Sequence, residues 1–235
     1  MILQNLQLLQ QSPAIFALVI GIGVIGLVVG FTIHEFCHAL AAHGEGDSTA
    51  HQMGRLTFNP LKHIDLFGFI LILVIGFGWA KPVQVDPYNL RHGRLGMSWV
   101  AVVGPLSNIV LAFLLGLLFR FELLNTRPGF SNTEDILAFA VSLIIFYNLV
   151  LGIFNLIPLP PLDGSKVLGG LLPRSLYGPY LRFERHGWLI LIGLVMANFL
   201  LSRVAGVNIL GSVITPPLRF LFGLAAGPDL ARFFF

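Results

Sequence analysis

The stretch PAIFALVIGIGVIGLVVGFTIHEFCHALAAH, residues 13–43, decides the fold of this protein. It is apolar and long enough to cross a bilayer as one helix, since about 20 apolar residues span the hydrocarbon core. Near its end stand His34, Glu35 and His38, which are costly to bury in hydrocarbon without a compensating partner. The sequence therefore predicts a membrane-spanning helix that binds a metal ion.

The pentapeptide His34-Glu35-Phe36-Cys37-His38 has the HExxH spacing of zinc sites. On a helix, positions 34 and 38 lie about one turn apart and about 40° around the axis, so both imidazoles can bind one zinc ion. Glu35 can reach a zinc-bound water as general base. The alternative is that the two histidines serve only packing or hydrogen bonding.

The composition describes what surrounds this motif. Hydrophobic residues make up 56% of the 235 residues, charged residues only 11%, and the mean hydropathy is +0.85, so the sequence predicts an integral membrane protein. Nearly all residues lie in apolar runs or short connections, which predicts one membrane-embedded domain over 1–235. The net charge of +3 comes from basic residues beside apolar runs, which indicates orientation in a lipid bilayer and no nucleic-acid partner.

Four apolar runs are long enough to span a membrane: Ala14–His43, Leu95–Phe119, Ile136–Ile157 and Trp188–Val207. Two shorter runs, Ile64–Ala80 and Leu210–Gly227, either span or re-enter the membrane. After the first of these, Pro82 opposes helix and Val83-Gln84-Val85 alternates, which predicts a short extended strand. The predicted fold is an all-α polytopic membrane protein with about four to six membrane segments and a short re-entrant or β-like element after the first helix.

The distribution of basic residues predicts the orientation. If Ile64–Ala80 re-enters, only Arg120 and Arg127 flank one side of the membrane. The other side then carries nine basic residues: Arg55, Lys62, Lys81, Arg91, Arg94, Lys166, Arg174, Arg182 and Arg185. By the positive-inside rule, the loops 44–94 and 158–187 are cytoplasmic and the N-terminus is outside.

A second motif, NLIPLPPLDG over residues 155–164, follows the third predicted span. Its three prolines break the helix and deliver the Asp163 carboxylate into apolar surroundings. Alone, an Asp-Gly pair after prolines is more often a turn. The predicted topology, however, puts Asp163 on the same side as the HExxH motif, which makes it the natural third zinc ligand and leaves a fourth position for water.

Together these motifs resemble those of the site-2 protease family of intramembrane zinc metalloproteases. The matching segments are HEFCH at 34–38, the stretch from Asn155 to Gly164, and GPLSN at 104–108, which resembles a GxxxN element. Segments 54–65 and 76–85 are also similar to those of compact bacterial members, which lack a PDZ or CBS module. For Asn108, a role at the site and a plain interhelical hydrogen bond both stay open.

The resemblance implies a zinc metalloendopeptidase that hydrolyses peptide bonds in transmembrane or membrane-proximal segments of membrane proteins. It implies one Zn²⁺ per chain bound by His34, His38 and Asp163, with Glu35 as general base. Asn155 would lie beside the metal and hydrogen-bond the substrate carbonyl or its oxyanion. It also implies a bacterial plasma-membrane protein whose active site opens toward the cytoplasm.

Two rival functions fit parts of this pattern. A non-catalytic zinc-binding membrane protein, either an inactive relative or a metal carrier, would use the same ligands, but it needs no positioned base such as Glu35. A different HExxH membrane protease would use a glutamate from a second motif as third ligand, and no glutamate stands near a predicted span end in such a motif. The residues carry no signal for an oligomeric state.

Overall fold

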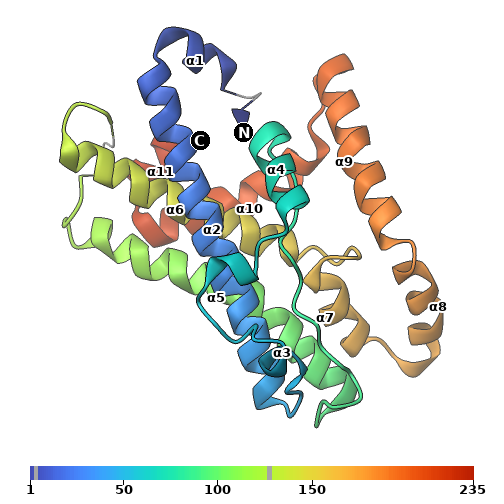
Figure 1. The fold of residues 1–235 in the computed structure, drawn as a ribbon. Coiled ribbons are helices and arrows are strands. Elements are labelled where there is room, and N and C mark those ends of the chain that lie inside the picture. The colour runs from blue at the N-terminus through green and yellow to red at the C-terminus, as the bar shows by residue number, and fades with distance from the viewer. Residues whose placement is uncertain (3–4, 126–128) are drawn as a thin grey trace.

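The computed structural model describes residues 1–2, 5–125 and 129–235, and within these ranges all regular structure is helical (Figure 1). Among the described residues, five helices are long and apolar enough to cross a membrane: α2 (Pro13–Gly44), α5 (Gly93–Arg120), α6 (Thr133–Asn155), α9 (Gly187–Val204) and α10 (Ile209–Ala226). The shorter helices are α1 (Leu6–Gln11), α3 (Thr49–Gln52), η2 (Pro60–Lys62), α4 (Leu66–Ile75), α7 (Asp163–Leu171), α8 (Arg174–Glu184) and α11 (Pro228–Phe234). The chain is an integral, polytopic, all-α membrane protein, as predicted.

The four predicted spans all form, and α10 shows that Leu210–Gly227 is a fifth helix of spanning length. The other ambiguous stretch is different. It forms α4, whose 10 residues extend about 15 Å, roughly half of the hydrocarbon thickness. The Asp65 side chain caps its start by accepting from the Gly68 N–H at 2.8 Å, and Gly76 ends it at φ 85°.

Residues 77–86 lead back from α4 without helix or strand. The strand expected at Val83–Val85 is not paired with another strand within the described ranges. The physical reason is a long-range contact: the Val83 N–H donates to the side chain of Glu35 instead of to a neighbouring backbone. Arg127, one of the two basic residues expected on the opposite side, lies outside the described residues.

Helix α5 is the centre of the bundle, since it packs against α2, α6, α7 and α10. The main apolar core lies where α5, α6 and α10 meet, and it buries Ala112, Ile145, Leu149 and Phe222 completely. Figure 1 shows α2 crossing α5 and α6, while α9 stands at the edge of the bundle. Both α2 and α7 contact the N-terminal half of α5, through His38 at Val100 and through Ser98 at the Lys166 carbonyl.

Close backbone contact holds α10 to α5. At Gly116 in α5, a Cβ atom would lie 2.5 Å from the carbonyl oxygen of Ala225 in α10. Real Cβ atoms essentially never approach so closely, and the obstacle is backbone that cannot rotate away. The absence of a side chain at this position therefore sets the distance between the two helices.

We predict that Gly116→Ala destabilises the protein by about 1–3 kcal/mol, because α5 and α10 must separate to admit the methyl group. The matched control is Gly21→Ala in α2, where an added Cβ meets nothing within 4 Å. That control should be neutral or slightly stabilising, since alanine favours helix over glycine. Thermal unfolding in detergent measures both, and equal melting temperatures for the two variants would contradict the prediction.

Candidate metal centre

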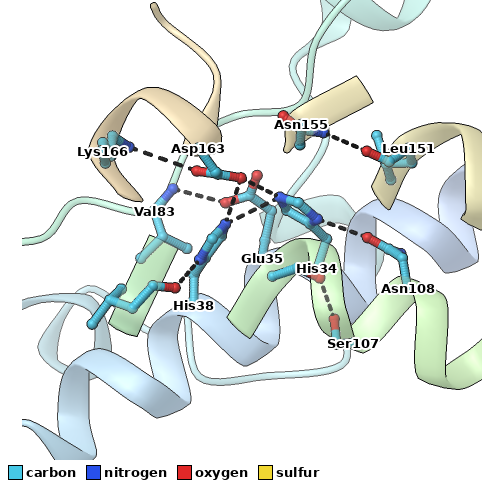
Figure 2. A network of polar contacts seen from close by, with 12 residues as sticks. His34, Glu35, His38, Val83, Ser107, Asn108, Leu151, Asn155, Asp163 and Lys166 are labelled. Carbon is cyan, nitrogen blue, oxygen red and sulfur yellow. Dashed lines mark hydrogen bonds and ion pairs between the residues drawn. The ribbon is translucent and has the colours of Figure 1, made fainter. Parts of the chain in front are cut away.

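Helix α2 presents the two histidines of the HExxH motif to one point (Figure 2). The Nε2 atoms of His34 and His38 lie 3.0 Å apart. Oδ2 of Asp163, the first residue of α7, lies 3.0 Å from Nε2 of His34 and 3.2 Å from Nε2 of His38. All three residues are buried, so the structure brings together the three predicted ligands in a group that could hold a metal ion.

The hydrogen bonds of the two Nδ1 atoms determine which ring nitrogen of each histidine carries the proton. Nδ1 of His38 lies 2.8 Å from the carbonyl oxygen of Val100, which can only accept, so Nδ1 donates. Nδ1 of His34 lies 2.7 Å from Oδ1 of Asn108, again an acceptor. In a neutral imidazole whose Nδ1 carries the proton, Nε2 carries a lone pair. Both Nε2 lone pairs therefore face the carboxylate.

The orientation of Asn108 follows from a further buried amide. Asn108 donates through Nδ2 to the Gly30 carbonyl at 2.9 Å and to Oδ1 of Asn148 at 2.9 Å, which turns its own oxygen toward His34. Asn148 in turn donates to the Ile144 carbonyl of its own helix at 2.9 Å. Asn108 and Asn148 are both fully buried. This chain of amides links α2, α5 and α6 and holds one tautomer of His34.

The donor set fits a cation. Two imidazole lone pairs and a carboxylate oxygen converge at a buried point, with no proton between them once both rings are protonated at Nδ1. Such a group repels itself unless a positive charge lies between its members. Two histidines and one carboxylate form a donor set typical of catalytic zinc.

The ring of His38 lies close against α5 because Gly104 has no side chain. A Cβ atom at Gly104 would lie 2.3 Å from Nε2 of His38. Any larger residue would displace the ring from its contact with the carboxylate. Gly104 is thus the functional residue of the 104–108 segment that faces His38, as Asn108 is the one that faces His34.

Contacts at the C-terminal end of α7 hold this helix, and with it Asp163, in place. Arg94 of α5 donates to the carbonyls of Gly169, Gly170 and Leu172, and its guanidinium lies over the Tyr177 ring. Asp163 itself stands at the helix N-terminus, where the exposed N–H groups favour a negative charge.

Glu35 lies beside the cluster on α2 and is buried. Its Oε2 accepts from the backbone N–H of Val83 at 2.9 Å, and Figure 2 shows its carboxylate pointing toward His34 and Asp163. No hydrogen bond to the other oxygen, Oε1, occurs within the described part of the chain. One carboxylate oxygen is therefore held and the other remains available.

Asn155 ends α6 close to the group in Figure 2, but the structure does not bond it to the cluster. Its Nδ2 donates to the Leu151 carbonyl one turn back at 3.0 Å. Lys166 lies on the other side, with Nζ 3.8 Å from Oδ1 of Asp163. Sequence reasoning gave no site role to Lys166 or Asn148, and only the polar Asn148 inside an apolar run offered a signal. It had placed Gly104 in the GxxxN element and Val83 in a strand, without the contacts to His38 and Glu35.

Comparison with known proteins agrees with this geometry. The profile of Peptidase family M50 matches residues 129–200, a region that contains Asn155 and Asp163. YwhC of Bacillus subtilis (strain 168), provisionally named a zinc metalloprotease, is 42% identical over 175 residues, which cover 72% of this chain and 77% of YwhC. Rip2 of Mycolicibacterium smegmatis, with the same provisional name, is 30% identical over 77% of this chain and 68% of Rip2.

A third relative, from Methanocaldococcus jannaschii and also provisionally named a zinc metalloprotease, is 33% identical over 66% of this chain and 73% of its own length. No solved structure matches the chain. Identity of this level over more than two thirds of several family members, together with the match to the family profile, shows that the chain belongs to peptidase family M50, the family of the site-2 proteases.

Proposed function

We propose that this chain is an intramembrane zinc metalloendopeptidase that hydrolyses peptide bonds in transmembrane or membrane-proximal segments of other membrane proteins. The observation that carries the proposal is that the ligand atoms of His34, His38 and Asp163 lie within 4.8 Å of one another. The two histidines and the adjacent Glu35 stand on α2, a helix of membrane-spanning length. We propose that the activity belongs to one membrane-embedded domain over residues 1–235 and that each chain binds one zinc ion.

In this proposal, His34, His38 and Asp163 hold the zinc ion and leave one position open. Zinc held there would supply Lewis acidity to a water molecule and a substrate carbonyl. Glu35 takes a proton from the attacking water on Oε1, the oxygen that Val83 does not occupy, and passes it to the departing amide nitrogen. Asn155 hydrogen-bonds the substrate carbonyl oxygen after its Nδ2 leaves the Leu151 carbonyl.

A transmembrane substrate must be unwound locally before it can react, because a helix engages its own carbonyls in hydrogen bonds. Hydrolysis also requires water, which the hydrocarbon core does not supply. We therefore propose that the site opens toward the cytoplasm, on the side of loops 44–94 and 158–187, in a bacterial plasma membrane. The basic residues of these loops support this orientation through the positive-inside rule.

The first prediction concerns metal binding. Asp163→Ala removes the only charged ligand, so it should abolish most zinc binding, measured as zinc per chain by mass spectrometry of purified protein. Asn108→Ala removes the hydrogen bond that orients His34 and should weaken zinc affinity about 10–100-fold without abolishing it. Ser107→Ala, one residue away, is the control and should bind zinc normally. Wild-type zinc content in Asp163→Ala would exclude this ligand.

The second prediction separates an enzyme from a zinc-binding protein without activity. Glu35→Gln keeps the shape of the side chain but cannot take a proton, so zinc should remain bound while cleavage of a single-span substrate falls about 10²–10⁴-fold. Asn155→Ala should retain zinc and slow cleavage about 10²–10³-fold. Cleavage at the wild-type rate by Glu35→Gln would refute the mechanism, and no cleavage by zinc-loaded wild type would favour a binding protein.

The third prediction tests orientation with two exposed serines. In a Cys37→Ala background, a cysteine at Ser131, between α5 and α6, should react with a membrane-impermeant thiol reagent added outside the cell. A cysteine at Ser175 in α8 should react only after the membrane is permeabilised. Labelling of position 175 in intact cells would reverse the orientation.

A further inference from the structure

We propose that Arg55 is a positioning residue that holds Glu35 through the single peptide unit between Pro82 and Val83. The proposal rests on the proposed function, because it assigns Arg55 a place in the action of the general base. Arg55 itself lies outside the membrane-spanning helices, in the loop between α3 and η2. It touches neither the three proposed zinc ligands nor Glu35 through any hydrogen bond within the described residues.

Arg55 is bound to the segment that follows α4. Its Nη2 donates to the Lys81 carbonyl at 3.2 Å and to the Pro82 carbonyl at 2.9 Å. The residue is only 4% exposed, which is rare for arginine and costly unless its donors are used. The same segment is held a second time, since the Lys81 N–H donates to the His63 carbonyl at 2.8 Å.

The carbonyl that Arg55 binds and the N–H that Glu35 binds belong to one planar peptide unit. The Pro82 C=O and the Val83 N–H share a peptide bond, and in a trans peptide they point in opposite directions. Arg55 therefore binds one edge of this plane, and Oε2 of Glu35 accepts from the other edge at 2.9 Å. Moving the plane would break both hydrogen bonds together.

This arrangement acts on Glu35 in two ways. A guanidinium on the carbonyl polarises the peptide, which strengthens the hydrogen bond that its N–H donates to the carboxylate. The rigid plane also fixes which carboxylate oxygen is occupied, so that Oε1 stays free of this hydrogen bond. Pro82 contributes to this rigidity because its ring fixes φ near −65°.

The charge of Arg55 reaches Glu35 as well. Burial lowers the pKa of the Arg55 guanidinium below its usual value, and the Glu35 carboxylate offsets part of this change. A buried cation near a carboxylate acts on it through its electric field, because the effective dielectric constant there is lower than in water.

The test compares Arg55→Ala and Arg55→Lys with Arg91→Ala, an exposed arginine in the same loop region, as matched control. In Arg55→Ala, kcat for a single-span substrate should fall about 10–100-fold, the usual cost of losing such a supporting contact, with KM and zinc content unchanged. Arg55→Lys can still donate to one carbonyl and should recover part of kcat. Arg91→Ala should match wild type.

A second readout does not depend on activity. Hydrogen exchange followed by mass spectrometry should show faster exchange in the peptide covering residues 82–86 in Arg55→Ala, and wild-type exchange elsewhere. If wild type cleaves no substrate, the proposed function fails, and exchange at 82–86 still tests the contact itself. Unchanged exchange at 82–86, a raised KM with wild-type kcat, or loss of zinc from Arg55→Lys would each overturn the assignment.

Discussion

The structure depends on three potential metal-ligand atoms, two imidazole nitrogens and one carboxylate oxygen, that meet at one buried point. His34 and His38 supply two of them because α2 sets their spacing, and Asp163 supplies the third from a separate helix. Helix α5 contacts both of these helices, α2 and α7. It carries Gly104 and Asn108 against the histidines, and it anchors α7 through Arg94 and Ser98. Helix α5 therefore positions α2 and α7 so that their ligand residues lie together.

The spans and the ligand types could be predicted from the sequence because both are local properties. An apolar run of sufficient length specifies a membrane helix, and the HExxH spacing fixes two ligands on one face of it. Asp163 was predicted by combining its motif with topology, and the structure brings it to the histidines. Leu210–Gly227 was ambiguous because its length lies near the limit for a span, and the structure shows it as the 18-residue helix α10, which is long enough to cross a membrane.

What the sequence could not supply are contacts between elements far apart in the chain. The amide chain from Asn148 to Asn108 to His34 joins three helices, and no spacing within one segment reveals it. The same holds for Val83, which was predicted to extend as a strand. Its N–H binds a carboxylate 48 residues earlier in the chain, and the alternation of apolar and polar side chains in Val83–Val85 could not predict this partner.

The uncharged nature of the residues behind the histidines has a consequence for electroneutrality. Asn108 and the Val100 carbonyl orient the rings without adding charge. A carboxylate in place of Asn108 would add one negative charge in a region of low dielectric constant, where an uncompensated charge is expensive. The amide at this position therefore holds the tautomer of His34 and leaves the charge balance between the ion, Asp163 and the nearby Lys166 unchanged.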